Sequence, residues 1–251
     1  NIFIINLVCL IPIILGFLIP VLFIIYNVIY EFSRIDFIKV FNLTTNTVII
    51  SLIATLVILV IAVYFQFLKR ILKNRTITFF NEVISLTYAL PGAVIGLSLI
   101  LLFTSYPFEN ELLIGSFGIL VYAYVIRYMA VGISPLKSSF DKHPSSYDDT
   151  AFNLGMGPTK LFRSIHLPIN KSAIAIAFLI TFVDIIKELP ITLILRPFNF
   201  DTLAVQTYEY AIEEMIPKSS IYSLAIVMLG TILLIFLKKI VNKEIDVPRS
   251  K

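Results

Sequence analysis

The fold of this chain is decided by a polar stretch that reads Asp149-Thr150-Ala151-Phe152-Asn153-Leu154-Gly155 and, after nine further residues, Ile165-His166-Leu167-Pro168. It lies between two long apolar blocks. An acidic residue at 149 suits the first turn of a short helix, where the helix dipole favours negative charge. Gly155 can adopt the left-handed conformation that closes that helix, and Pro158 suits the first turn of another. The stretch therefore predicts two short helices joined by a glycine turn, with Pro168 disfavouring continuation of the second.

The apolar blocks on either side indicate a membrane protein. Hydrophobic residues make up 58% of the 251-residue chain and charged residues 14%, and the mean hydropathy is +0.93. Such a composition is rare in a soluble domain, and blocks of about twenty apolar residues can cross a bilayer as helices. We predict an all-α polytopic membrane protein, a single transmembrane domain over residues 1–251. Its six transmembrane helices are expected near residues 2–29, 43–68, 79–103, 112–133, 172–195 and 219–237.

The distribution of basic residues predicts the orientation of these helices. If each span crosses the membrane, segments 69–75, 137–171 and 238–251 share one side and carry 14 Lys and Arg residues, whereas the opposite segments carry 4. Loops rich in Lys and Arg remain in the cytoplasm. We therefore expect the polar loop and both termini to be cytoplasmic.

The polar stretch resembles the cytoplasmic EAA loop of ABC-importer permeases, whose pattern is E-A-A, three residues, Gly, nine residues and I-x-L-P. In that family the first short helix docks on the ATPase subunit and transmits its movement. The resemblance implies an ATPase-coupling loop over residues 137–171; the alternative is an ordinary helix-turn-helix between two spans. Every spacing fits, with Asp and Thr in place of Glu and the first Ala, and the matching residues are Asp149, Thr150, Ala151, Gly155, Ile165, Leu167 and Pro168.

Ionisable residues interrupt the fifth predicted span at Asp184, Lys187 and Glu188, just before Pro190. Charges at membrane depth are costly unless they face protein, water or one another. The spacing places Asp184 and Glu188 on one helical face, and Pro190 is expected to bend the helix beside them. Two compatible interpretations remain: the cluster neutralises itself and fixes the bend, or it forms a polar gate in a translocation path.

Two further features of the spans concern packing. Gly92 and Gly96 follow Pro91 as a small-xxx-small pair, which we expect to admit a neighbouring helix rather than to contact a substrate. Arg127 lies toward the end of the fourth span, and we expect its side chain to extend to the cytoplasmic interface.

The segment after the charged cluster resembles the C-terminal half of iron(III) ABC-importer permeases, which carry K-E-L-P-A-T-L-L-L-R-P-F-x-F-D-T-L-A and a Y-E-Y-A-like segment. Residues 187–204 match nearly residue for residue, with Ile191 where Ala is common, and residues 208–211 read Y-E-Y-A. The resemblance covers about residues 149–214 and implies a six-span half of a type I importer transmembrane domain. Because the chain begins with Asn1, we expect it to be one half of a longer permease.

This resemblance implies a permease subunit of a binding-protein-dependent importer in the bacterial inner membrane, with ferric iron as substrate. The implied partners are an ABC ATPase subunit that holds ATP and Mg, an extracytoplasmic iron-binding protein, and a second permease half or a second copy. We expect no cofactor on this chain and no enzymatic activity, because the sequence has no G-x-x-x-x-G-K-[ST] phosphate loop. Nucleic-acid binding is not expected, since topology explains the basic segments.

Ferric iron prefers oxygen ligands, and the predicted outer segment offers several. We expect these side chains to receive the binding protein rather than to form a preformed metal site. The outer-face candidates are Asp201, Tyr208, Glu209 and Tyr210.

Other functions stay open. A permease for thiamine, a polyamine or an oxyanion would share the coupling loop, whereas an ion-coupled secondary transporter would use the charged fifth span without an ATPase. Dependence on a partner ATPase distinguishes these classes. An intramembrane enzyme is disfavoured, because no nucleophile–base pair or metal-ligand cluster lies in the apolar blocks apart from the Asp/Lys/Glu group.

Overall fold

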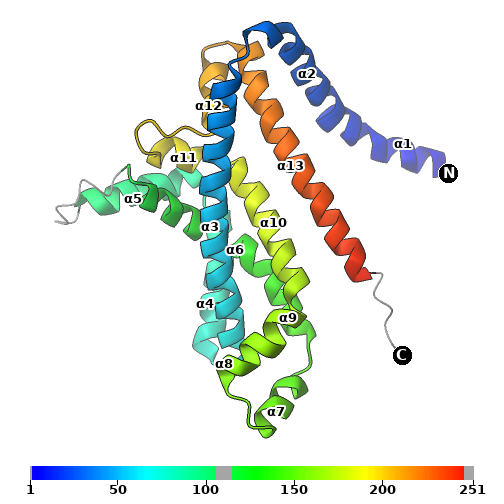
Figure 1. Ribbon diagram of the computed structural model, residues 1–251, viewed down its shortest axis with the longest axis vertical. Coiled ribbons are helices and arrows are strands. Elements are labelled where there is room, and N and C mark those ends of the chain that lie inside the picture. The colour runs from blue at the N-terminus through cyan, green and yellow to red at the C-terminus, as the bar shows by residue number, and fades with distance from the viewer. Residues whose placement is uncertain (1, 106–114, 246–251) are drawn as a thin grey trace. The chain divides into compact units, whose positions relative to one another are not determined.

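A computed structural model describes residues 2–105 and 115–245 of the chain, with the side chains of residues 8–105 and 115–240, and every element in these ranges is helical (Figure 1). The expected all-α fold is confirmed. The longest helices are α3 (Phe37–Leu72), α6 (Phe117–Lys142) and α13 (Ile216–Ile245).

The first predicted span consists of α1 (Ile2–Ile13), the π-helical turn η1 (Ile14–Leu18) and α2 (Ile19–Glu31). Pro12 lies in α1 and Pro20 in the first turn of α2, so the irregular turn falls between the two prolines. A proline cannot donate a backbone hydrogen bond to the preceding turn, which accounts for an irregular helix here. The short 3-10 turn η2 (Phe32–Arg34) then leads toward α3.

Four described helices are long and apolar enough to cross a membrane, and six spans result if each of two bent helix pairs is one span. The third predicted span is one such pair: α4 (Arg75–Leu86) and α5 (Gly92–Ser105) meet at 108° around the 3-10 turn η3 (Thr87–Ala89). The boundaries of the six spans stay a prediction, and residues 112–114 of the fourth lie outside the described residues. The four helices are Val8–Arg34, Phe37–Leu72, Phe117–Lys142 and Ile216–Ile240.

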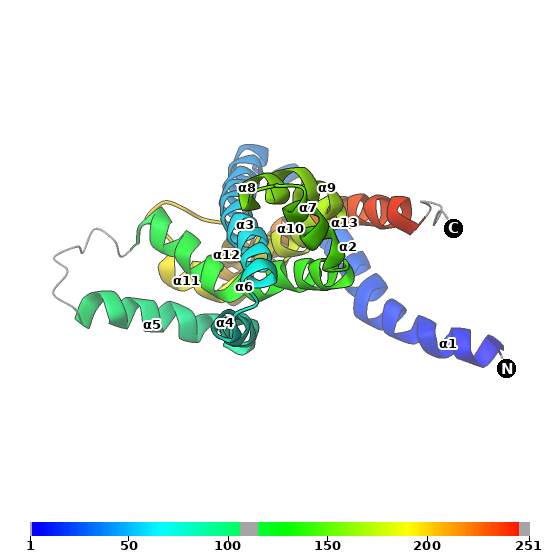
Figure 2. The ribbon, with the colours of Figure 1, turned by 90° about the horizontal axis from the view of Figure 1, so that it is seen from below.

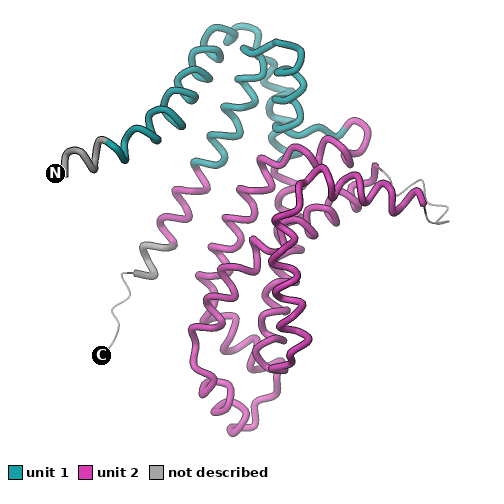
Figure 3. Tube along the Cα trace, turned by 180° about the vertical axis from the view of Figure 1, so that it is seen from behind, with its two compact units in different colours: residues 1–47, 200–231 teal, residues 48–199, 232–251 magenta. Residues whose placement is uncertain are grey.

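The chain divides into two compact units, coloured differently in Figure 3. Unit 1 comprises residues 1–47 and 200–231 and contains α12 (Leu203–Ile212). The backbone N–H of Leu203 donates to Thr47 Oγ1 at 2.9 Å, and Asn46 Nδ2 donates to the Asp201 carbonyl at 3.2 Å. These bonds join the start of α12 to α3 beside a small core of Leu43, Leu203, Tyr222 and Ala225.

Unit 2 comprises residues 48–199 and 232–251, and its centre is formed by α3, α6 and α10 (Lys171–Ile186). Helices α6 and α10 pack against each other, and Figure 2 shows α3 nearly end-on while α6 runs across the view. A Cβ atom added to Gly132 of α6 would lie 2.6 Å from Ile58 Cγ2 of α3, so the two helices approach too closely for any larger residue.

The fifth predicted span is interrupted, because α10 ends at Ile186 and α11 (Pro190–Leu195) begins at Pro190. The expected bend at the proline is therefore confirmed as a complete break of the helix. Helix α5 approaches α11 closely at Gly96, where an added Cβ atom would lie 3.2 Å from the Ile194 side chain. The close helix approach that the glycine pair predicts is confirmed.

The polar loop contains α7 (Ser146–Asn153), α8 (Pro158–Leu161), the π-helical turn η4 (Phe162–His166) and α9 (Leu167–Ile169). Gly155 adopts a φ of +77°, as expected for the residue that closes the first helix. The second helix continues one residue past Pro168, to Ile169, and the chain then bends by 70° before α10 begins at Lys171. The wide π-helical turn before Pro168 accommodates a residue without an N–H group.

Candidate functional site

An arginine whose side chain is 12% exposed holds the polar loop against the end of α3. Arg70 Nη1 donates to the carbonyl oxygens of Phe140 at 2.6 Å and His143 at 2.9 Å, and Nη2 donates to that of Pro144 at 2.8 Å. Carbonyls at the end of a helix lack partners within it, and α6 ends at Lys142. Arg70 therefore satisfies the C-terminal end of α6 and the turn that follows.

The same guanidinium also binds the first turn of α7. Arg70 Nε donates to Asp148 Oδ2 at 2.6 Å, and His166 Nε2 donates to Asp148 Oδ1 at 2.7 Å. Both the carboxylate and the imidazole are buried. Burial lowers the pKa of His166, which lies in the loop between spans, so its ring is neutral at pH 7. We refer to Arg70, Asp148 and His166 as the loop clamp.

Aromatic side chains pack around the His166 ring of the loop clamp and shield it from water. The His166 ring stacks on Phe140 with centroids 5.5 Å apart, and its centroid lies 5.3 Å from that of Phe67 on α3. Phe67 and Phe140 form a buried cluster with Ala151 and Leu161, against which Ile165 packs. Two residues of the EAA-like pattern, Ala151 and Ile165, thus hold the loop to the ends of α3 and α6.

The remaining positions of the pattern turn away from this cluster. Asp149, Thr150, Gly155 and Pro168 are exposed, and Leu167 is half-buried. Three large side chains beside them are also exposed, and Leu154 is the most accessible at 76%. Figure 1 shows α7 at the opposite end of unit 2 from α11. The outward face of α7 consists of Tyr147, Asp149, Thr150 and Phe152, and exposed Leu154 follows directly after the helix.

A second buried carboxylate lies at the break between α10 and α11. Glu188 Oε1 accepts from the backbone N–H of Ile191 at 3.1 Å, and the Glu188 carbonyl accepts from the Thr192 hydroxyl at 2.9 Å. A carboxylate at this position satisfies a free N–H of the first turn of α11 and complements its dipole. Glu188 therefore belongs to the start of α11 rather than to α10.

Helix α6 supplies the other partners of Glu188. Tyr128 donates its hydroxyl hydrogen to Oε2, and Arg127 Nε lies 3.5 Å from the same oxygen. Arg127 Nη1 donates to the Leu90 carbonyl at 2.5 Å, and its guanidinium lies 5.9 Å from the centroid of the Tyr88 ring. We refer to Arg127, Tyr128 and Glu188 as the helix-break network.

The start of α5 lies in close contact with the helix-break network. A Cβ atom added to Gly92 would lie 2.7 Å from Glu188 Oε1 and 3.4 Å from Arg127 Cζ. The glycine therefore lets α5 approach the ion pair, a role that the sequence pattern alone did not assign to it.

Two expectations about these charges are wrong. Lys187 pairs with Asp184 at 2.8 Å and is 61% exposed, whereas Glu188 turns toward α6. Asp184 and Glu188 do not share a face, because α10 ends at Ile186 and the helical spacing ends with it. Arg127 does not extend to an interface but binds Leu90 and approaches Glu188. An arginine inside an apolar span was the signal that could have identified it.

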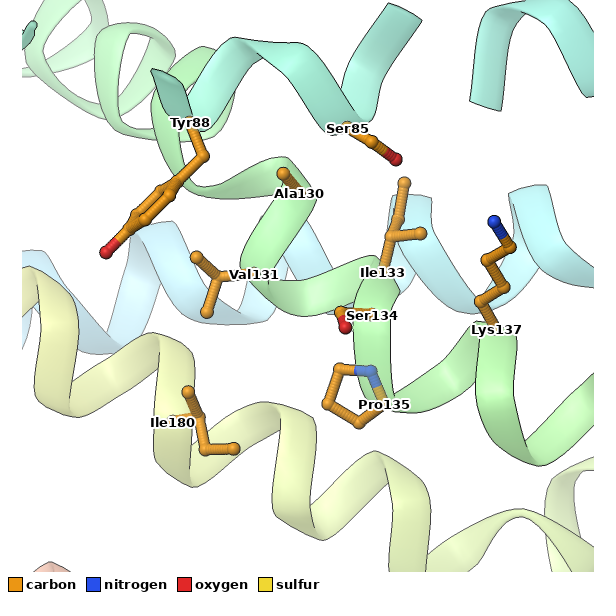
Figure 4. A pocket seen from close by; sticks show the side chains of 9 residues that line it. All are labelled: Ser85, Tyr88, Ala130, Val131, Ile133, Ser134, Pro135, Lys137 and Ile180. Atoms are coloured by element: carbon orange, nitrogen blue, oxygen red, sulfur yellow. The ribbon is translucent and has the colours of Figure 1, made fainter. Parts of the chain in front are cut away.

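A cavity of about 470 Å³ in unit 2 lies beside the helix-break network. Figure 4 shows the side chains of Ser85 and Tyr88 on one wall and those of Ser134 and Lys137 on α6, with Ile180 of α10 below. Tyr88 belongs to both features, because its ring lies near the Arg127 guanidinium. The cavity wall therefore carries hydroxyl groups and one ammonium group among apolar side chains.

The contacts of the outer-face candidates involve different neighbours. Tyr208 is exposed, Glu209 accepts from Gln206 Nε2 at 3.4 Å, and the Tyr210 hydroxyl accepts from Lys39 Nζ at 3.3 Å. Asp201 is half-buried, and its carbonyl binds α3 as described above. Among the described residues, no group of three or more His, Cys, Asp or Glu side chains could hold a metal ion.

Comparison with known proteins gives one family match. Residues 72–247, more than half of the chain, match the family described as "Binding-protein-dependent transport system inner membrane component". This range includes the polar loop and the break between α10 and α11, and Arg70 lies just before it.

Individual relatives agree with this match. Over 224 residues the chain is 27% identical to the Fe(3+)-transport system permease protein FbpB 2 of Haemophilus influenzae (strain Rd), covering 88% of this chain and 44% of that protein. Over 94 residues it is 32% identical to the maltose/maltodextrin transport system permease protein MalG of Escherichia coli (strain K12), covering 37% of this chain and 31% of that protein. The chain thus spans less than half the length of these relatives.

Proposed function

Because the chain belongs to the family of binding-protein-dependent transport system inner membrane components, we propose that it is a permease subunit of an ABC importer for ferric iron. The substrate assignment is supported by the similarity to a relative named for Fe(3+) transport, which extends over 88% of this chain. The iron-permease-like segment at residues 187–204 is consistent with this assignment.

The proposed partners supply what this chain lacks. A separate ATPase subunit binds ATP and Mg and drives transport, and an extracytoplasmic binding protein delivers iron near residues 196–216. A second permease half or a second copy completes the path across the bilayer. The excess of basic residues on one side favours a cytoplasmic polar loop, and hence cytoplasmic termini.

The observation that carries this proposal is the two-faced environment of α7. Its inner face is fixed to α3 and α6 through Asp148 and Ala151, whereas Asp149, Phe152 and Leu154 face outward. A short helix that is rigidly held and partly apolar on its free side is suited to dock in a groove of another protein. In this arrangement a movement of the ATPase subunit displaces the ends of α3 and α6 together with α7.

Helix α6 offers a route from the loop to the membrane-embedded charges. It is continuous from Tyr128, in the helix-break network, to Phe140, beside the loop clamp. Twelve residues of α-helix span about 18 Å. We assign the gate to the region of Asp184, Lys187, Glu188 and Pro190, and the adjoining cavity to the wall of the path. Displacement of α6 would shift Arg127 and Tyr128 relative to Glu188, which supplies the two-state element that alternating access needs.

Uptake of ferric iron by cells that carry the complete system tests the proposal. Asp149→Lys places a positive charge on the outward face of α7, so we expect uptake and capture of the ATPase subunit to fall together at normal membrane levels. Asp141→Lys is the matched control, since Asp141 is also an exposed carboxylate near the loop. Equal uptake in wild type and Asp149→Lys would contradict the docking role.

A permease for another substrate is the second candidate. It is favoured by the 94-residue similarity to relatives named for maltose and maltodextrin transport. The same cells supplied with labelled maltose, thiamine, a polyamine or an oxyanion distinguish the two. Uptake of one of these, with no uptake of iron, would keep the family assignment and overturn the substrate.

A further inference from the structure

Unit 1 contains a pocket of about 310 Å³ whose wall includes one of the outer-face candidates, Tyr210. Its wall comes from the turn before α3, from the first turn of α3, from α12 and from the first two turns of α13. The polar side chains that line it are those of Arg34, Asp36, Lys39, Tyr210, Lys218 and Tyr222. Three of these are cations and one is an anion, so the pocket carries excess positive charge.

Two ammonium groups in this pocket converge on one aromatic ring. Lys39 Nζ lies 5.2 Å from the centroid of Tyr210, and Lys218 Nζ lies 5.9 Å from the same centroid. Tyr210 is held in place by stacking on Tyr222, with centroids 5.6 Å apart. Like charges gathered in this way repel each other unless an anion lies between them.

The acidic groups nearby have other partners. Asp36 Oδ1 accepts from the backbone N–H of Lys39 at 3.0 Å, and buried Glu31 pairs with Arg34 at 3.9 Å. Within residues 8–105 and 115–240, neither Lys39 nor Lys218 has a carboxylate within 4.0 Å. Lys39 donates to the Tyr210 hydroxyl, which leaves two of its three hydrogens for a ligand.

The surface around the turn before α3 is apolar. Phe32, Phe37, Ile38 and Phe41 are each exposed by more than 60%. Aromatic and apolar side chains beside cations at the end of a membrane helix are typical of the interface, where lipid phosphates lie. A free anion in water would gain nothing from these side chains, whereas the acyl chains of a lipid would cover them.

We propose that this pocket binds the phosphate group of an anionic phospholipid. Lys39 and Lys218 donate charge-assisted hydrogen bonds to its oxygens, and Tyr210 positions both ammonium groups. The bound headgroup offsets the repulsion between the two lysines and joins the start of α3 to the start of α13.

The test uses the assembled, delipidated importer in detergent, titrated with phosphatidylglycerol and followed by its Tm and by native mass spectrometry. Wild type is expected to retain the lipid and to rise in Tm. The double variant Lys39→Gln/Lys218→Gln is expected to need about tenfold more lipid for the same rise in Tm, because it loses at least one charged hydrogen bond to the phosphate. Lys238→Gln/Lys239→Gln, two exposed lysines toward the other end of α13, is the matched control and should bind like wild type.

Further arms separate the possible sources of the anion. An equal rise in Tm with inorganic phosphate alone would overturn the lipid assignment, and an equal rise with phosphatidylcholine would overturn the selectivity for an anionic lipid. If the double variant binds phosphatidylglycerol normally but no longer binds the substrate-binding protein, the pocket is a protein-docking site and the proposal is wrong. Tyr210→Phe removes only the hydroxyl group and is expected to retain the lipid more weakly than wild type. This variant tests the pocket even if the double variant does not fold.

Discussion

Unit 2 contains two arginine–carboxylate pairs, which differ in how completely the arginine is hydrogen-bonded. In the loop clamp, Arg70 donates to Asp148 at 2.6 Å and to three backbone carbonyls. In the helix-break network, Arg127 has one carbonyl partner, Leu90, and its Nε lies 3.5 Å from Glu188 without a hydrogen bond.

This difference separates a fixed site from an adjustable one. Buried ion pairs contribute to a rigid structure only when further hydrogen bonds satisfy both groups. The loop clamp meets that condition at every guanidinium nitrogen, whereas the helix-break network leaves Arg127 Nε without a bond. We infer that the clamp transmits displacement of α7 and that the network is the place where the structure rearranges.

The largest expected effect comes from Arg70→Met, which keeps an unbranched apolar stem and removes the guanidinium group with its charge. Asp148 then lies buried without a cation, so the free energy of local opening should fall by about 3–5 kcal/mol. Hydrogen exchange of residues 144–160 measures this change. Lys69→Met is the control, because its partner Asp141 is 59% exposed and such surface pairs contribute about 1 kcal/mol or less. Unchanged protection in Arg70→Met would show that the clamp does not hold the loop.

The second effect concerns transport rather than the loop. Glu188→Gln keeps an oxygen for the N–H of Ile191 but leaves Arg127 without a negative partner, so we expect iron uptake to fall by about tenfold. Capture of the ATPase subunit should remain normal, because the loop clamp is intact. Asp184→Asn, which alters only the pair with exposed Lys187, should change uptake less. Equal losses in the two variants would contradict a special role for Glu188.

A smaller effect is expected from Gly92→Ala. The new Cβ atom would lie 2.7 Å from Glu188 Oε1, and such overpacking costs about 1–3 kcal/mol. The Tm of the purified protein should fall, whereas Gly118→Ala on α6 should leave it nearly unchanged, because its nearest neighbour lies at 3.8 Å. A Tm for Gly92→Ala equal to that of wild type would show that α5 moves away without cost.

The smallest effect is the pH dependence of the loop clamp. Burial lowers the folded-state pKa of His166 below its ordinary 6.5. The neutral imidazole therefore contributes fully to the stability of the folded loop above pH 6.5, and this contribution is lost as the pH falls through the lowered folded-state pKa. Proteolysis of the loop should accelerate on that acidic side. His166→Gln should remove this pH dependence, and its persistence in the variant would assign it to another group.

The sequence predicted those parts of the fold that depend on local signals. Gly155 closes α7 and Pro190 starts α11, because left-handed backbone and a missing N–H group are properties of single residues. Long apolar blocks likewise predict helices, although the 108° bend near Pro91 depends on packing around it.

Partners that are far apart in sequence could not be predicted. Arg70 and Asp148 are separated by 78 residues, and Tyr128 and Glu188 by 60. From a single sequence, the adjacent acidic residues at 148 and 149 are equally good candidates for the inward-facing position. The exact start of α7 decides which one faces inward, and helix boundaries are uncertain by a residue or two from sequence signals.

Docking of α7 on the ATPase subunit is tested most directly by site-specific cross-linking. Cys9 is the single cysteine of the chain, so Cys9→Ser provides a cysteine-free background. Leu154→Cys, at the exposed residue directly after α7, is compared with Phe198→Cys, which is fully exposed after α11. We expect the ATPase subunit to cross-link to residue 154 and not to residue 198. No cross-link at residue 154, or equal cross-linking at both, would contradict the account.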